Sequence, residues 1–300
     1  HHWFYHLCRM THKAGFINII GNPNVGKSTL MNAIIGERLS IISPKAQTTR
    51  HRIFGILNHD DYQLVFSDTP GVIQPAYALQ ESMMTFVKTA FEDADVFLYI
   101  VEPGEKALKN EGFFKHLQET DIPVLLLVNK IDLIDQEKLE EVTAYWAGLL
   151  PKAEVIPVSA LKKFHTDYLL QRLLEIAPEN PPYFDKDSIT DRSERFIVSE
   201  IIREKILNNY DKEVPYSVEI EVEEFKEEET IIRVRAIIHV ARESQKGIII
   251  GHKGSMLKRV GTQARKECEA FFGKQLYLEL FVKVSKDWRL DDKKLKRFGY

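Results

Sequence analysis

The sequence predicts an α/β fold with a mostly parallel sheet, followed by a smaller α+β domain. Up to about residue 177, short apolar runs rich in β-branched residues alternate with amphipathic stretches, which is typical of βαβ units. Three prolines within residues 178–182 then interrupt this pattern, because proline continues neither a helix nor a central strand. At 300 residues the chain is also about twice the ~150 residues expected of one domain.

Strand-like runs in the first part of the chain occupy residues 16–20, 64–66, 96–101, 124–128 and 155–158. Helical patterns separate them, including one over residues 29–35, so helices should cover both faces of the sheet. Beyond the prolines the expected elements are a helix at 194–208, strands at 217–225 and 230–241, helical pieces flanking Gly251, and a strand at 276–284. This order favours a three-stranded sheet with helices on one face.

These patterns divide the chain into four segments. We interpret residues 1–12 as an N-terminal extension, in part additional to a natural chain that starts at Met10. The first domain is expected at residues 13–178 and a linker at 179–190. The second domain, with a C-terminal tail, is expected at 191–300.

Composition excludes several classes of protein. Hydrophobic residues make up 44% and charged residues 28%, which is ordinary for a globular chain. The longest apolar run, 124–128, falls far short of the ~20 residues of a bilayer span. Cys8 and Cys268 support neither a disulfide framework nor a zinc site, so we expect a reducing, cytoplasmic setting. A formal charge of −3 means that any nucleic-acid binding must come from local charge.

A phosphate-binding motif follows the first strand. GNPNVGKS, residues 21–28, matches G-x-x-x-x-G-K-[ST] between a strand and a helix, the context that this motif requires. Its glycines let successive N–H groups point at phosphates, beside the positive end of the helix. Lys27 would reach the β and γ phosphates, and the Ser28 hydroxyl would bind Mg²⁺. A chance glycine-rich turn is the alternative.

The second motif is DTPG, residues 68–71, at the end of the next predicted strand. Ligands of open α/β sheets bind at this carboxyl edge, so Asp68 should lie beside the phosphate loop and hold Mg²⁺ through water. The Gly71 amide, with no side chain to obstruct it, would touch a γ-phosphate. The alternative is an ordinary turn, which these residue types also favour.

The third motif, NKID at residues 129–132, selects the base. Guanine presents two donors, N1–H and the 2-amino group, and the Asp132 carboxylate accepts both. Adenine would leave a carboxylate oxygen unsatisfied, and sites built on such pairs discriminate strongly. The motif therefore predicts GTP over ATP, and the loop of Ser159 and Ala160 is expected to meet the guanine carbonyl.

A polar loop with QTTR, residues 47–50, lies between the first two motifs. A threonine there would ligate Mg²⁺ in the presence of the γ-phosphate and release it afterwards, as in a switch loop. Thr49 is favoured over Thr48. The alternative is that both are ordinary loop hydroxyls.

The order GNPNVGKS, QTTR, DTPG, NKID, SA resembles the translation-factor-related GTPases, and LSIISPKAQTTRHRIFGI resembles the bacterial Era family. The resemblance implies a P-loop GTPase domain that hydrolyses GTP slowly with Mg²⁺. Val72 stands where small Ras-like GTPases carry a water-orienting glutamine. The catalytic candidates are therefore Lys27, Thr49 and Gly71, and the resemblance implies K⁺ binding at Asn24. The candidate nucleotide-binding residues are Gly21, Asn22, Pro23, Asn24, Val25, Gly26, Lys27, Ser28, Thr29, Asp68, Thr69, Pro70, Gly71, Val72, Asn129, Lys130, Asp132, Ser159 and Ala160.

Charge is patterned in the second domain. Residues 211–229 hold 9 acidic and 2 basic residues, whereas residues 230–275 hold 10 basic and 3 acidic. Within the basic part, GIIIGHKG at 247–254 resembles the G-x-x-G signature of KH domains, which clamp single-stranded RNA, and the element order fits the type II KH topology. A generic helix–helix turn or a solvated charged face is the alternative. The candidate RNA-binding residues are Lys246, Gly247, Ile250, Gly251, His252, Lys253, Gly254, Lys258 and Arg259.

ITDRSERFIVSEIIREKI, PYSVEIE and WRLDDKKLKRFGY extend the Era resemblance over residues 11–300. It implies binding to the 3′ end of 16S rRNA as a checkpoint in biogenesis of the 30S ribosomal subunit, and loose contact with the inner membrane. We expect a monomer. We hypothesise that GTP orders the loop of Thr49 and alters the RNA surface through the linker at 178–182. The alternatives are an assembly factor with merely structural nucleotide and, less favoured by NKID, a P-loop enzyme acting on a small molecule.

Overall fold

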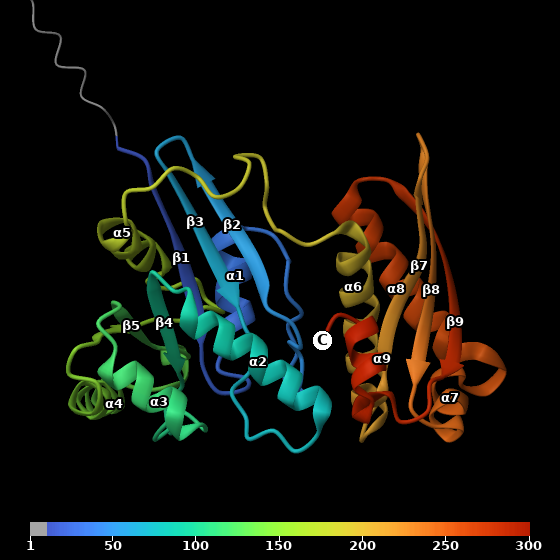
Figure 1. Ribbon diagram of the computed structural model, residues 1–300, viewed down its shortest axis with the longest axis horizontal. Coiled ribbons are helices and arrows are strands. Elements are labelled where there is room, and N and C mark those ends of the chain that lie inside the picture. The colour runs from blue at the N-terminus through green and yellow to red at the C-terminus, as the bar shows by residue number, and fades with distance from the viewer. Residues whose placement is uncertain (1–10) are drawn as a thin grey trace, which may run out of the picture.

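The computed structural model describes residues 11–300, which form two domains, each built around its own sheet (Figure 1). Of the predicted N-terminal extension, residues 1–10 lie outside the described part, and so does Cys8. Cys268 is a free, buried thiol. None of the helices formed by residues 11–300 combines the length and the apolar character needed to cross a membrane.

The first sheet has six strands in the order β2-β3-β1-β4-β5-β6. They are β1 (Lys13–Ile20), β2 (Ile53–His59), β3 (Tyr62–Asp68), β4 (Val96–Val101), β5 (Val124–Val128) and β6 (Glu154–Pro157). Every pairing is parallel except that of β2 with β3. The predicted parallel α/β architecture is therefore confirmed, and all five predicted strands are present.

Strand β2 was not predicted from the sequence. It forms an antiparallel hairpin with β3, in which Ile53 lies opposite Asp68 and His59 opposite Tyr62. Its run IFGILNH contains a central glycine and ends in polar residues, which weakens the local strand pattern. Gly55 is needed there because a Cβ would lie 2.9 Å from Ile35 and 3.1 Å from Met31 of the helix that covers β2.

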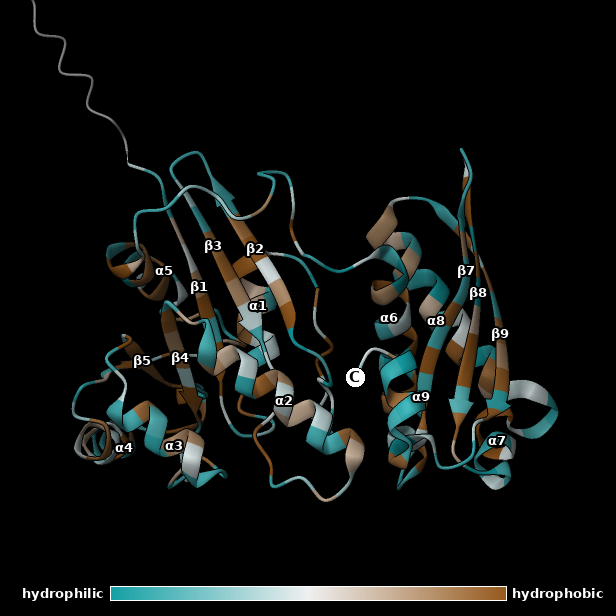
Figure 2. Cartoon of the chain, in the orientation of Figure 1, coloured by the Kyte–Doolittle hydropathy of each residue, from teal (hydrophilic) through white to brown (hydrophobic). Residues whose placement is uncertain are grey.

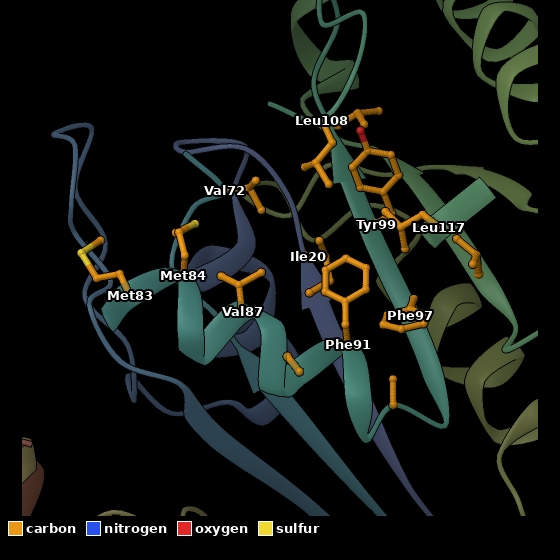
Figure 3. Close-up of a cluster of buried hydrophobic side chains, with 14 of the residues drawn as sticks. Ile20, Val72, Met83, Met84, Val87, Phe91, Phe97, Tyr99, Leu108 and Leu117 are labelled. Atoms are coloured by element: carbon orange, nitrogen blue, oxygen red, sulfur yellow. The ribbon is translucent and has the colours of Figure 1, made fainter. Parts of the chain in front are cut away.

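Helices cover both faces of this sheet (Figure 1). They are α1 (Lys27–Ile35), α2 (Ala78–Glu92), α3 (Glu111–Glu119), α4 (Gln136–Leu149) and α5 (Thr166–Ile176). Successive strand residues point to opposite faces, so β1 sends Ile19 into the core beneath α1 and α5 and Ile20 into the core beneath α2 and α3. Figure 2 shows the strands as the hydrophobic part of the domain. In Figure 3, Phe91 of α2 and Phe97 of β4 illustrate the second core, with ring centroids 5.2 Å apart.

The segment between the domains is fixed to the edge of the sheet. The Gln63 side chain of β3 accepts hydrogen bonds from the backbone N–H groups of Tyr183 (2.8 Å) and Phe184 (3.0 Å). The N–H of Ile56 in β2 donates to the carbonyl of Ile189 at 2.9 Å. The predicted linker therefore runs along β2 and β3 before it enters the second domain (Figure 1).

The second sheet has the order β7-β8-β9, with strands β7 (Glu219–Glu227), β8 (Ile231–Val240) and β9 (Gln275–Val284). β7 and β8 are antiparallel, and β8 and β9 are parallel. Its helices are α6 (Glu194–Asn209), α7 (Glu243–Ile250) and α8 (Ser255–Phe272), so the predicted α-β-β-α-α-β order is confirmed. A 3₁₀ turn, η2 (Val214–Ser217), delays the first strand to Glu219.

The C-terminal tail folds back between the two domains (Figure 1). It forms η4 (Trp288–Leu290) and α9 (Asp292–Arg297), two elements that the sequence did not predict. Trp288 is fully buried and belongs to the same apolar cluster as α2, while its indole N–H donates to the Ser217 carbonyl at 2.8 Å. The tail therefore joins the core of the first domain to the second.

Candidate functional site

The phosphate loop leaves β1 and enters α1 at Lys27. Gly26 has φ 103°, a left-handed conformation, and a Cβ there would lie 2.2 Å from the Asn129 side-chain nitrogen. At Gly21 a Cβ would lie 2.7 Å from the Ile100 carbonyl. Both glycines of the motif are thus required by close backbone approaches.

Lys27 points back into the loop that it follows. Its ammonium group is buried and donates to the carbonyls of Gly21 (3.2 Å) and Asn22 (2.8 Å). Burial lowers the pKa of Lys27 to about 8, although Asp68 and Glu105 act in the opposite direction. This side chain supplies positive charge inside a ring of backbone groups, as a phosphate site requires.

Three candidate metal ligands from separate segments meet beside Lys27. The Ser28 hydroxyl donates to Asp68 Oδ2 at 2.6 Å and lies 3.1 Å from Thr49 Oγ1. Asp68 is fully buried, which raises the pKa of its carboxyl group. Its Oδ1 atom has no hydrogen-bond partner within residues 11–300. A buried oxygen without a partner is costly, and a hard cation with oxygen ligands would satisfy it, so this group fits Mg²⁺.

The DTPG segment is fastened to the phosphate loop through its backbone. Val72 N–H donates to the Gly21 carbonyl at 3.0 Å, and the Thr69 hydroxyl donates to the Ile19 carbonyl at 2.7 Å. At Gly71 a Cβ would lie 2.7 Å from the Pro23 Cα. The Val72 side chain is fully buried in the core shown in Figure 3, so nothing at this position points toward the phosphate site.

Asn24 and Lys130 connect the phosphate loop to its neighbours. The Asn24 side-chain N–H donates to the Pro44 carbonyl at 2.8 Å, in the loop that leads to Thr49. Lys130 Nζ donates to the Asn24 carbonyl at 2.7 Å and to Glu102 at 2.5 Å. Potassium binding at Asn24 stays a prediction.

Asn129 and Asp132 have different surroundings in the predicted base site. Asn129 is buried, donates to the Val25 carbonyl at 2.7 Å and accepts from the Ala160 N–H at 3.0 Å. It therefore braces two loops. Asp132 is exposed and accepts one hydrogen bond, from the Ser159 hydroxyl at 2.8 Å, which leaves the carboxylate accessible to a ligand.

A cavity of ≈ 640 Å³ joins these motifs. Of the predicted residues, its lining contains Pro23, Asn24, Gly26, Lys27, Ser28, Thr29, Thr49, Thr69, Gly71, Asn129, Lys130, Asp132 and Ser159. The other nucleotide candidates, Gly21, Asn22, Val25, Asp68, Pro70, Val72 and Ala160, are absent from the lining. The sequence missed Ile42, Leu133 and Leu161, which line the cavity with exposed apolar side chains. The sequence gives no sign of these three residues, because only the folded structure shows that their apolar side chains are exposed.

Glu105 is a further residue that the sequence missed. Its carboxylate accepts from the Asn22 side chain at 3.1 Å, and Asn22 also donates to the Ala107 carbonyl and accepts from the Lys109 N–H. Burial, reinforced by the nearby Glu102, raises the pKa of Glu105 to about 7. The hydrogen bonds of Asn22 thus hold the phosphate loop against the segment after β4.

The GIIIGHKG segment comprises the end of α7 and the turn that leads into α8. Gly251 has φ 74°, and a Cβ there would lie 2.6 Å from the Met256 side chain; Gly254 also has a positive φ, of 75°. His252, Lys253, Lys258 and Arg259 are exposed. The isoleucines of this segment differ in burial: Ile249 is buried in the core, while Ile248 is exposed.

A shallow groove of ≈ 370 Å³ lies between α8 and β9. Gly254 and Lys258 are the RNA candidates that line it; Lys246, Gly247, Ile250, Gly251, His252, Lys253 and Arg259 are absent from its lining. The other lining residues are Leu257, Gly261, Thr262, Arg265, Leu278 and Leu280. The two leucines of β9 reach the groove because β9 pairs in parallel with β8, a tertiary pairing without a local sequence signal.

Two families match this chain. Residues 16–130 match the 50S ribosome-binding GTPase family, and residues 213–289 match a KH domain family. The chain is 48% identical to GTPase Era of Syntrophus aciditrophicus (strain SB) over 296 residues, 98% of this chain and 97% of that protein. It is 45% identical to GTPase Era of Thermoanaerobacter sp. (strain X514) over 294 residues, 97% of each chain.

Two solved structures of Era share the fold. A crystal structure of Era in complex with MgGDPNP and nucleotides 1506–1542 of 16S ribosomal RNA superposes with a TM-score of 0.92, at 38% identity, over 96% of this chain and 99% of that chain. A variant of Aquifex aeolicus Era bound to GDP·AlF₄⁻ gives the same TM-score of 0.92, identity and coverage. With both of its domains matched and nearly its full length aligned, the chain is a GTPase that belongs to the Era family.

Proposed function

We propose that this GTPase is a Mg²⁺-dependent switch that binds the 3′ end of 16S rRNA and acts as a checkpoint in biogenesis of the 30S subunit. The observation that carries the proposal is the contact of Thr49 with Ser28, which in turn donates to Asp68, because it couples the loop of Thr49 to the phosphate site. The Era structure that holds MgGDPNP together with 16S rRNA nucleotides supports both halves of the proposal.

The chemistry follows from the groups around the cavity. Ser28, Thr49 and Asp68 would hold Mg²⁺, which would neutralise phosphate charge there. Lys27 and the inward N–H groups of the phosphate loop stabilise the negative charge that develops on the phosphoryl oxygens during transfer. The buried Val72 offers no polar group to the attacking water, so the phosphate loop and the Gly71 amide carry the catalysis and turnover is slow.

Guanine selection is assigned to Asp132. Its exposed carboxylate faces the cavity near Ser159, while Asn129 fixes the position of the surrounding loops. Two donors on guanine match this acceptor, and adenine lacks both of them, because its N1 is an acceptor and it carries no 2-amino group. For Asn24 we retain the K⁺ site implied by the family resemblance; replacing K⁺ by Na⁺ without a change in turnover would remove it.

RNA binding is assigned to the GHKG turn and the adjoining groove. The groove offers an apolar floor for bases in Leu257, Leu278 and Leu280, and a cationic rim in Lys258 and Arg265. Exposed Lys253 and Arg259 add positive charge next to it. An apolar floor beside phosphate-binding cations suits a short single strand of RNA.

A salt titration tests this assignment. Affinity for an oligonucleotide of the 16S 3′ end is measured for the wild type, Lys253→Ala and Arg259→Ala, with Lys226→Ala on the far strand β7 as the matched control. Each lost phosphate contact should lower the slope of log affinity against log salt by about one, with the control unchanged. Unchanged slopes in both variants would contradict the RNA surface.

The setting follows from the RNA partner. A protein that acts on 16S rRNA works where ribosomal subunits are assembled, so we expect this chain to act in the cytoplasm, as a monomer. Contact with the inner membrane rests on the family resemblance alone.

A further inference from the structure

The second domain binds the loop of Thr49 on both sides of that residue. Before Thr49, the guanidinium group of Arg203 in α6 donates to the carbonyls of Gln47 (3.2 Å) and Thr48 (2.5 Å). After it, Arg50 donates to the carbonyl of Val218 at 2.7 Å. The partners are separated by 155 to 168 positions in the chain. Thr49 thus lies between these two contacts with the second domain, and its side-chain oxygen lies 3.1 Å from that of Ser28.

Arg203 is built to hold one position. It is 1% exposed, and its Nε and Nη2 atoms donate to the two carboxylate oxygens of Glu200 at 3.0 and 2.8 Å. This forked pair orients the planar guanidinium group, so its remaining donors face the loop carbonyls. Because the pair is buried, withdrawing Arg203 would leave a buried carboxylate without its partner. The arginine therefore presents fixed donors to the loop.

Neighbouring contacts extend the same interface. Lys45 Nζ donates to the carbonyls of Leu207 and Tyr210 at the end of α6, where a helix leaves acceptors unsatisfied. The His51 ring stacks on the Tyr300 ring, with the ring centroids 4.4 Å apart. The loop from Lys45 to His51 consequently lies on α6 and the C-terminal tail.

We infer that Arg203, held by Glu200, is a positioning residue for GTP hydrolysis: it fixes the backbone before Thr49 so that the Thr49 hydroxyl meets Ser28. The inference rests on the proposed role of Thr49 as a Mg²⁺ ligand in the GTP state. GDP lacks the γ-phosphate, so its affinity should not depend on this contact. By linkage, GTP stabilises the docking of the second domain as much as docking stabilises bound GTP. The coupling runs through this contact in addition to the linker.

The test compares variants of the full chain. Arg203→Lys keeps the charge but loses the forked geometry. Glu200→Gln/Arg203→Met removes both charges together, so that no unpaired charge stays buried, and it serves as the second variant if Arg203→Lys does not fold. The matched control is Arg195→Lys: Arg195 lies on the same helix but, among residues 11–300, donates only to the carbonyls of Val222 and Glu223 in its own domain.

The readouts are kcat for GTP and the affinities for GDPNP and GDP, each at saturating Mg²⁺. We expect both Arg203 variants to lower kcat and GDPNP affinity about tenfold, within the range of ordinary coupling energies, and to leave GDP affinity unchanged. The control should match the wild type. Equal losses of GDPNP and GDP affinity, or wild-type behaviour of both Arg203 variants, would overturn the inference.

Thr49→Ala separates this inference from the proposed function. If Thr49→Ala lowers GTP hydrolysis and the Arg203 variants do not, the positioning role is wrong while the metal role stands. If Thr49→Ala hydrolyses GTP at the wild-type rate, the metal-ligand role itself is wrong, and the positioning role falls with it.

Discussion

The side-chain oxygens of Ser28 and Thr49 lie 3.1 Å apart, although Ser28 lies in the first turn of α1 and Thr49 lies in the loop that leads to β2. Ser28 also donates to Asp68, which has a buried oxygen without a partner in residues 11–300. The three side chains thus form one polar cluster that a divalent cation would complete. This arrangement links the position of the loop to what occupies the phosphate site.

Thr49→Val should lower GTP hydrolysis at least about tenfold, because valine keeps the shape of threonine but offers no oxygen ligand. GDP affinity should not change, since the loop acts on the γ-phosphate state. Turnover of GTP and calorimetry with GDP check both statements. Thr49→Ser restores the hydroxyl and should recover most of the rate. Wild-type turnover in Thr49→Val would contradict the metal role.

Gly71→Ala should abolish most GTP hydrolysis. The added Cβ would lie 2.7 Å from the Cα and 2.9 Å from the nitrogen of Pro23, and a backbone cannot yield as a flexible side chain does. The DTPG segment must then move away from the phosphate loop. Gly148→Ala in α4, where a Cβ would meet no atom of residues 11–300 within 4 Å, is the control and should stabilise its helix by up to about 1 kcal/mol. Normal turnover in Gly71→Ala would show that the close approach is unnecessary.

Asp132→Asn should weaken GDP binding by about 3–6 kcal/mol, roughly two to four orders of magnitude, because two hydrogen bonds to a charged acceptor are lost. Asparagine retains an oxygen for the Ser159 hydroxyl, so the loop should stay in place. Its amide N–H groups match the 2-oxo group of xanthine, and xanthosine diphosphate should bind the variant better than the wild type does. Calorimetry with both nucleotides measures this. An unchanged preference for GDP would assign guanine selection elsewhere.

Glu105→Gln should change the pH dependence of stability. A carboxyl group whose pKa is raised on folding from 4.5 to about 7 stabilises the folded state fully below pH 4.5, and this contribution is lost as the pH rises through about 7. A glutamine side chain does not ionise, so the variant does not lose stability in this way as the pH rises, and its amide oxygen can still accept the hydrogen bond from Asn22. The free energy of unfolding of the variant minus that of the wild type should therefore be about 2 kcal/mol larger at pH 8 than at pH 5.

Chemical denaturation at pH 5 and pH 8 measures this difference. Glu37→Gln is the control, because it makes the same replacement at an exposed side chain. The same difference between the two pH values in wild type and Glu105→Gln would contradict the buried carboxyl group.

The phosphate and base motifs could be predicted from the sequence because each is contiguous and follows an apolar strand such as β5. Their meeting also follows from the sequence, since parallel strands end at one edge of a sheet. The GHKG turn was predictable for the same local reason. The α8–β9 groove was not, because Leu278 and Leu280 lie far along the chain from Lys258.

The contacts between the domains had no local signal. In the sequence, Arg203 is simply one of the charged residues of a predicted helix. The carbonyls that accept its hydrogen bonds lie 155 and 156 positions away in the chain. Trp288 and α9 lie in a segment that the sequence described only as a tail. Such long-range contacts depend on how two folded domains dock, which neither periodicity nor a motif encodes.

In the proposed switch, the nucleotide state controls the RNA surface. The most direct measurement is the affinity of the full chain for the 16S 3′-end oligonucleotide with GDPNP·Mg²⁺ and with GDP at one salt concentration. We expect the two affinities to differ by about fivefold or more, and Arg203→Lys should reduce the corresponding coupling free energy. Equal affinities in the two nucleotide states would contradict it.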